Sequence, residues 1–157
     1  MSEAPQSGLV SSDVEAEIGF LLAIASQLFT TRVTEVVARS GLTYTQFSLL
    51  NHLAGQSDAT ISEIAAAMEI NQPGVSKVVQ RLAETDLVAV AEDPADSRRR
   101  RVSISSSGRG RLARAQQLLE ADGADWFADW PAGDRVAFRD HLSTFVAWLD
   151  ANRRTQA

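Results

Sequence analysis

The sequence contains no cysteine, one lysine and two histidines, and this narrows the chemistry available to it. Without cysteine, disulfides, zinc–thiolate sites and thiol-based redox sensing are excluded. His52 and His141 fit no metal-ligand spacing, and the sequence has neither a glycine-rich phosphate loop nor a nucleophile elbow. We therefore predict no catalytic site, no metal site and no cofactor, and we do not expect an enzyme.

Long apolar runs and a secretory leader are also missing. No uninterrupted apolar run approaches the roughly 20 residues that a membrane span needs. Residues 1–10 have neither the basic nor the apolar region of a signal peptide. The 157 residues, of which 45% are hydrophobic and 22% charged, suit one globular domain. These features predict a cytoplasmic protein with no membrane partner.

The net charge of −5 conceals an uneven distribution. Residues 71–114 contain nine basic and five acidic side chains, a local charge of +4, so the remainder of the chain carries −9. The basic residues include four consecutive arginines, Arg98 to Arg101, and the only lysine, Lys77. Such a segment attracts phosphate, while the acidic remainder is repelled from it. The distribution therefore favours a nucleic-acid-binding protein with one basic face.

Capping boxes, in which Ser or Thr is followed three residues later by Glu or Gln, predict where three helices begin. They are Ser12 with Glu15, Thr43 with Gln46, and Thr60 with Glu63. Apolar residues recur at helical spacing after each of them. The sequence thus predicts a long helix over residues 12–39, a second from 43 to about 54, and a short third one after Thr60.

A fourth helix, over residues 72–85, follows the third after a tight turn, which is the arrangement of a helix-turn-helix. Asn71 or Gln72 can cap it, and Pro73 falls in its first turn, where a missing N–H has no cost. Its apolar residues face the preceding helices. The outer face is left with Gln72, Gly74, Ser76, Lys77, Gln80 and Arg81.

Residues 87–105 have the pattern of a β-hairpin, or wing, with β-like ends at 87–90 and 102–105. The part between these ends holds Asp93, Pro94, Asp96 and the four arginines, so we predict that the arginines form a charged hairpin tip. A basic hairpin tip beside a helix pair can bind the DNA backbone while the second helix of the pair contacts base edges.

Side chains alternate along a strand, so only about two of the four wing arginines can share one side. We expect Arg98 and Arg100 to lie at the DNA groove. Arg99 and Arg101 are expected to touch phosphate or to pair with the aspartates of the wing.

Two helices complete the chain. Ser106 or Ser107 can cap a long helix that runs to about Trp130, where Pro131 ends it, and an apolar stripe predicts a last helix. The predicted fold is mainly α with a small β-hairpin wing. A winged helix-turn-helix in residues 43–105 is flanked by helices at 12–39 and 106–153, all within one domain of residues 1–157.

The order of these elements and several short motifs resemble the multiple antibiotic resistance regulator (MarR) family. The matching segments are residues 62–65, 73–82, 87–88, 93–98 and 107–108. The most specific is the aspartate-x-arginine of the wing, Asp96-Ser97-Arg98. The resemblance implies a homodimer whose terminal helices, 12–39 and 106–153, intertwine, and whose recognition helices enter successive major grooves of a pseudo-palindromic double-stranded operator.

By the same resemblance, residues 73–81 face bases and phosphates, Arg98 reaches a minor groove, and Asp96 holds the wing arginine in place. Two positions depart from the family pattern. Asp86 stands where many members carry Gly, and it tolerates left-handed backbone less freely. Val90 stands where many members carry Arg, so one customary positive contact is missing.

The family is known for binding aromatic acids between the dimer helices and the DNA-binding module, so the resemblance also implies a small aromatic or lipophilic effector. The side chains expected near it are Gln27, Thr31, Phe47, Leu50 and His52. A second set of apolar side chains, in the C-terminal helices, is expected to form core or subunit interface: Trp126, Phe127, Trp130, Phe138, Phe145 and Trp148.

The sequence therefore predicts a sequence-specific DNA-binding transcriptional regulator, a repressor relieved by a small ligand. Two alternatives stay open: a constitutive, ligand-independent DNA-binding protein, and a winged-helix module that binds only protein. The arginine cluster argues against the second, because such a module does not need a positive tip beside a positive helix.

Overall fold

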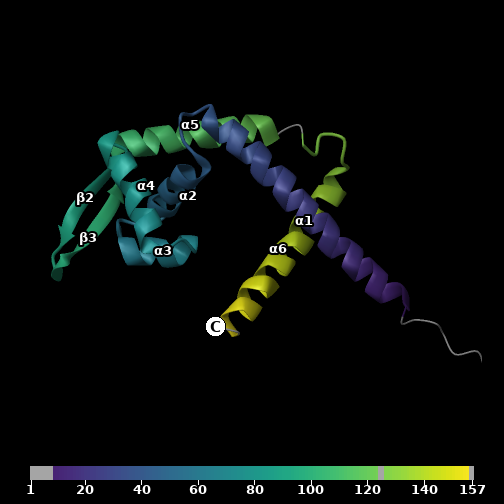
Figure 1. Cartoon of the computed structure of the whole chain (residues 1–157). Coiled ribbons are helices and arrows are strands. Elements are labelled where there is room, and N and C mark those ends of the chain that lie inside the picture. Colours follow the sequence, from purple (N-terminus) through teal and green to yellow (C-terminus); the bar gives the residue numbers. More distant parts are fainter. Residues whose placement is uncertain (1–8, 124–125, 156–157) are drawn as a thin grey trace, which may run out of the picture. The chain divides into compact units, whose positions relative to one another are not determined.

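The computed structural model describes residues 9–123 and 126–155 (Figure 1). The chain divides into two compact units, one ending at Leu119 and the other beginning at Glu120. The elements in order are α1 (Leu9–Ala38), α2 (Tyr44–Ala54), β1 (Ala59–Thr60), α3 (Ile61–Met68), α4 (Gln72–Glu84), β2 (Val88–Asp93), β3 (Asp96–Ile104), α5 (Ser106–Gly123) and α6 (Ala132–Thr155). The fold is mainly helical with one small antiparallel sheet, as the sequence predicted.

Two of the three predicted capping boxes are confirmed. Thr43 caps α2 together with Gln46, and Thr60 caps α3 together with Glu63. The carboxylate of Glu63 accepts hydrogen bonds from the amide of Thr60 at 2.7 Å and from its hydroxyl at 2.9 Å. These bonds favour the charged carboxylate, so they lower the pKa of Glu63. The start of the helix pair is thereby fixed by local hydrogen bonds.

The cap of α4 also follows the prediction. The side chain of Asn71 accepts a hydrogen bond from the amide of Gly74 at 2.8 Å, and Pro73 lies in the first turn. Asp86, where the sequence departs from the family's glycine, has a positive φ of 56°. An aspartate tolerates this left-handed conformation better than most residues, because its short polar side chain can bond to nearby backbone.

Three helix boundaries were predicted wrongly. The first helix begins at Leu9 and not at Ser12, because no glycine or proline between these residues interrupts the helix. The cap of α5 is Ser105, not Ser106 or Ser107: its hydroxyl accepts from the amide of Gly108 at 2.9 Å and donates to the carbonyl of Asp86 at 2.6 Å. The same helix ends at Gly123 rather than near Trp130.

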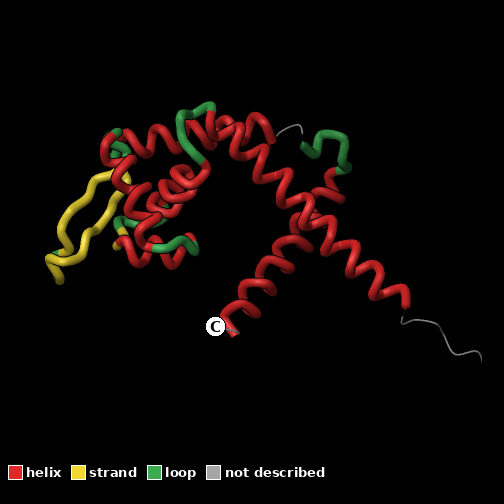
Figure 2. Tube along the Cα trace, viewed as in Figure 1, coloured by secondary structure: helices red, strands yellow, loops and turns green. Residues whose placement is uncertain are grey.

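The wing belongs to a three-stranded sheet in the order β1-β3-β2 (Figure 2). The four arginines lie within strand β3 rather than in the hairpin turn, which corrects the predicted tip. Strand β3 pairs with β2 as far as Asp93 opposite Asp96, so pairing continues through the arginines. Strand β1 was not predicted, because a strand of two residues has no visible periodicity.

The core of the first unit joins α2, α3 and α4 to the end of α1, the sheet and α5. Its fully buried side chains include Leu49, Leu50, Leu53, Ile64, Leu82, Val36, Val37, Val75 and Val102. In Figure 1 the β2–β3 hairpin projects from one end of this helical body. The core therefore holds α4 and the root of the wing in one rigid arrangement.

From Asp13 onward, where the burial of α1 is described, the buried side chains are Val33, Val36 and Val37 in its last part. Earlier in the helix, large apolar side chains are exposed: Val14, Ile18, Phe20, Leu21, Ile24, Leu28 and Phe29.

Among the described residues, the segment Asp13–Ala38 is long and apolar enough to cross a membrane by length and composition. The sequence prediction considered only uninterrupted apolar runs, so it did not single out this helix. One such helix is weak evidence for a span, since a core helix of a soluble protein passes the same test.

The second unit contains α6 and two groups of aromatic rings. Phe127, Trp130 and Phe138 pack on one another with ring centroids 5.3 to 6.0 Å apart. Phe145 and Trp148 stack with centroids 6.1 Å apart. The predicted stripe of α6 remains exposed on this chain, with Phe138, Leu142, Phe145 and Leu149 each more than a third accessible.

Gly108 allows α5 to start directly against the wing. A Cβ built at this position would clash with the carbonyl of Leu87 and lie 2.9 Å from a side-chain carbon of Ile104. We therefore expect Gly108→Ala to destabilise the fold by about 1–3 kcal/mol, the cost of overpacking a tight site. Urea denaturation at fixed protein concentration measures the change.

Gly110 provides the matched control, because a Cβ there meets no atom within 4 Å. Gly110→Ala should stabilise the same helix by up to about 1 kcal/mol, since alanine is the better helix former. Equal effects of the two substitutions would contradict the close approach at Gly108.

Candidate nucleic-acid interface

Helix α4 presents a polar face opposite its buried residues Val75, Val79 and Leu82. The exposed residues of this face are Gln72, Pro73, Ser76, Lys77, Gln80 and Arg81. Gly74, which was also predicted to lie on this face, is half-buried, and a Cβ there would lie 2.9 Å from a side-chain carbon of Ile70. The glycine thus lets the start of α4 pack closely against Ile70.

The wing arginines differ in their partners. Arg100 pairs with Glu92 across the hairpin at 2.7 Å, and Arg99 lies 3.6 Å from Asp96. Both pairs are well exposed, so each contributes little to stability and can exchange for another anion. Within residues 9–123 and 126–155, the side chains of Arg98, Lys77 and Arg81 form no ion pair, which leaves their charges available to a ligand.

Asp96 organises the turn of the wing. Its Oδ1 accepts a hydrogen bond from the backbone amide of Arg98 at 3.0 Å. The contact that holds Arg98 is therefore to its main chain, and the guanidinium group remains exposed.

A groove of about 320 Å³ separates the wing from the helix pair. It is lined by Thr60, Ile61, Ser62, Gln72, Ser76, Arg98, Arg99 and Arg100. Five residues predicted to touch DNA, from two segments of the chain, thus meet around one hollow. Ser62, which the sequence did not single out, is exposed at the start of α3 and belongs to the same wall.

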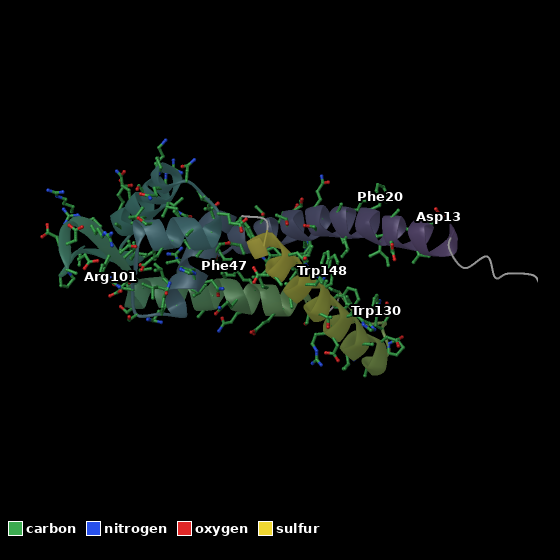
Figure 3. The ribbon with its side chains drawn as sticks, turned by 90° about the horizontal axis from the view of Figure 1, so that it is seen from below. Asp13, Phe20, Phe47, Arg101, Trp130 and Trp148 are labelled. Atoms are coloured by element: carbon green, nitrogen blue, oxygen red, sulfur yellow. The ribbon has the colours of Figure 1, made fainter. Side chains whose placement is uncertain are left out.

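Arg101 has a different environment from the other three arginines (Figure 3). Its Nε donates to Oδ1 of Asp58 at 2.8 Å, its Nη2 donates to the same oxygen, and its Nη1 donates to Oδ2 of Asp93 at 3.3 Å. The pairing with Asp93 was predicted, but the pairing with Asp58 was not. Asp58 lies 43 residues away in sequence, and the two-residue strand that brings it close leaves no pattern.

The charges of this cluster reinforce one another. The hydrogen bond from the amide of Ala95, at 2.9 Å, lowers the pKa of Asp93, and Arg101 lowers it further. The hydrogen bond to Asp58 raises the pKa of Arg101. Both shifts favour the charged forms of Asp93 and Arg101.

The residues expected to bind an effector do not share one site. Phe47 and His52 line an open pocket of about 520 Å³ between α2 and α3, together with Tyr44, Thr45, Ser48, Asn51, Ala67, Met68 and Ile70. Gln27 and Thr31 are exposed on α1 and do not line this pocket. Leu50 is fully buried in the core, so its prediction as a ligand contact is wrong.

His52 is half-buried at the wall of the pocket. The amide nitrogen of Gln56 lies 2.7 Å from its Nε2, within hydrogen-bonding distance. Polar side chains and aromatic rings thus line the pocket, which suits a small planar molecule with hydrogen-bonding groups.

The fold and the basic groove define a winged helix-turn-helix protein. The family model of the MarR family matches residues 40–99. Over 129 residues the chain is 30% identical to the HTH-type transcriptional repressor NicR of Pseudomonas putida, covering 80% of this chain and 79% of that protein. The chain belongs to the MarR family, and the relative NicR is named a transcriptional repressor.

Solved structures agree with this assignment. The crystal structure of wild-type MarR from E. coli superposes with a TM-score of 0.73 at 19% identity, covering 93% of this chain and 98% of that one, and shows the shared fold. The structure of BpsR from Bordetella bronchiseptica superposes with a TM-score of 0.68 at 28% identity, covering 83% and 98%. The DNA binding of BpsR is regulated by 6-hydroxynicotinic acid.

Proposed function

We propose that this chain is a cytoplasmic, non-enzymatic repressor that binds a pseudo-palindromic DNA operator as a homodimer and is released by a small aromatic ligand. One observation carries the DNA-binding part. Lys77 and Arg81 on α4 and Arg98 on the wing, whose side chains form no ion pair among the described residues, belong to the same compact unit. Lys77 and Arg81 are one helical turn apart, so their repulsion is relieved when a phosphate lies between them.

In this proposal the outer face of α4 contacts the major groove and the wing contacts the neighbouring minor groove. Gln72, Ser76, Lys77 and Gln80 supply side chains that can hydrogen-bond to base edges or phosphates. The side chain of Gln80 donates a hydrogen bond to Glu84 at 3.0 Å. It must break this bond before it can donate to a DNA base. Arg98 enters the minor groove, while Arg99 and Arg100 exchange their exposed carboxylate partners for phosphate.

The homodimer is supported by the apolar side chains that α1 and α6 each leave exposed. Monomeric proteins rarely expose such long apolar stripes, and a second copy can cover them. A two-fold dimer also places two recognition helices on half-sites about 34 to 36 Å apart, as a pseudo-palindromic operator requires.

Relief by a ligand is supported by NicR, which is named a repressor, and by BpsR, whose DNA binding is regulated by 6-hydroxynicotinic acid. The pocket between α2 and α3 offers the rings of Tyr44 and Phe47 and the imidazole of His52 to a molecule of that size. A ligand releases DNA only if it binds the DNA-free arrangement more tightly than the DNA-bound one.

Fluorescence anisotropy on DNA from the region upstream of the gene, and on scrambled DNA, tests the DNA-binding proposal across a salt series. We expect tighter binding to the upstream DNA, a steep salt dependence, and saturation at two chains per operator. Weak binding that ignores both sequence and salt would instead favour the protein-interaction alternative.

Arg98→Ala should weaken operator binding by about 1–3 kcal/mol and reduce the salt slope by about 1, because one groove contact is lost. Arg139→Ala is the control: it removes an exposed arginine outside the basic segment, which pairs with Asp140 at 2.8 Å. Unchanged affinity in Arg98→Ala would refute the assignment of Arg98 to the groove.

Addition of 6-hydroxynicotinic acid or related aromatic acids to the bound operator should lower the affinity for DNA. His52→Ala should blunt this response and leave the affinity without ligand unchanged, because His52 is outside the basic groove. If no aromatic acid shifts the affinity, the constitutive DNA-binding alternative is the better description.

A further inference from the structure

We infer that Arg101, Asp58 and Asp93 form an ion-pair lock that sets the angle of the wing, and that Arg101 is a positioning residue rather than a DNA contact. This inference rests on the proposed DNA binding and adds the element that orients the wing for it. It also assigns a role in DNA affinity to an acidic residue, Asp58.

The lock joins three separate parts of the chain. Asp58 precedes strand β1, Asp93 ends strand β2, and Arg101 lies on strand β3 between them in the sheet. Two donors of Arg101 reach Asp58 and one reaches Asp93. A planar guanidinium group that is held by two carboxylates resists rotation, so it restrains the strands that carry it.

The lock is continuous with the start of the helix pair. Arg101 is the register partner of Thr60 in the β1–β3 ladder. Thr60 is also the cap of α3, through its reciprocal bonds with Glu63. The side chain of Asp58 and the backbone of Thr60 therefore tie the same point of the wing to the first turn of α3.

The turn of the wing is attached at the other end of the lock. Asp93 is 8% exposed, and it accepts from the amide of Ala95 as well as from Arg101. The ladder is irregular between Glu92 and Asp93, a place where a hairpin can bend. Arg101 thus holds the residue at which the hairpin would otherwise pivot.

The charge balance argues against a phosphate contact by Arg101. One guanidinium group with two carboxylates has a net charge of −1, and the side chain of Arg101 is only 32% exposed. Arg98, by contrast, is exposed and has no carboxylate partner in the described chain. A phosphate approaching Arg101 would have to displace Asp58 or Asp93 and leave that carboxylate unpaired.

Asp58→Asn gives the sharpest test, because simple electrostatics and the lock predict opposite results. Removing a negative charge near DNA should strengthen binding if only the local charge matters. The lock predicts weaker operator binding, on the order of tenfold, because a charge-assisted bond that orients the wing is lost. The salt slope should stay unchanged, since no phosphate contact is removed.

Two further variants serve as controls. Glu92→Gln removes a carboxylate that pairs with Arg100 within the hairpin, and both partners of that pair are more than half exposed. It should leave the affinity unchanged or raise it slightly. Asp58→Glu keeps the charge and should retain most of the affinity that Asp58→Asn loses.

Amide hydrogen exchange of the free protein supplies a readout that needs no DNA. Faster exchange in strands β2 and β3 of Asp58→Asn, with unchanged exchange in α2 and α4, is the expected result. If the wild-type chain binds no DNA, the proposed function fails, while the exchange result still decides the lock. Unchanged exchange, or operator binding as tight as wild type in Asp58→Asn, would overturn the inference.

Discussion

Strand β3 is hydrogen-bonded to β1 along one edge and to β2 along the other. This double pairing determines how the side chains around the basic groove are arranged. The strand lies between β1 and β2, and Val102, near its C-terminal end, is fully buried. A slip of one residue would expose Val102 and turn an arginine inward, so the register is strongly fixed. With this register, Arg101 faces Thr60 of β1, while Arg98 to Arg100 extend past the end of that two-residue strand.

The same register separates the arginines into groups with different electrostatic environments. Arg101 is neutralised by two carboxylates, Arg99 and Arg100 have exchangeable partners on the surface, and Arg98 is unpaired among the described residues. The local excess of positive charge counted along the sequence therefore overstates how many side chains can hold phosphate. Position in the strand, rather than residue type, decides the role of each arginine.

Local chemistry was predictable from the sequence and long-range pairing was not. Helix caps and left-handed backbone depend on neighbours within a few residues, so the local sequence indicates them. Examples are the caps at Thr43, Thr60 and Asn71 and the backbone of Asp86. The contact of Asp58 with Arg101 depends on a short strand and a separation of 43 residues, and no periodicity signals it.

Effector contacts were the least predictable part of the site. Leu50 lies on the same helix as Phe47 and His52, but helical rotation places it in the core while the other two line a pocket. A resemblance identifies which helices take part in such a site. It does not show which side chains of a helix remain accessible, because accessibility is set by packing against the other elements.

The unburied apolar length of α1 ties the stability of the protein to its abundance. Large apolar side chains between Val14 and Leu28 are exposed within one chain, so in the proposed dimer each copy stabilises the other by mass action. At low copy number, chains would dissociate and lose order together with affinity for the operator. Gene dosage would then act on the repressor twice, through the number of molecules and through the fraction that is folded.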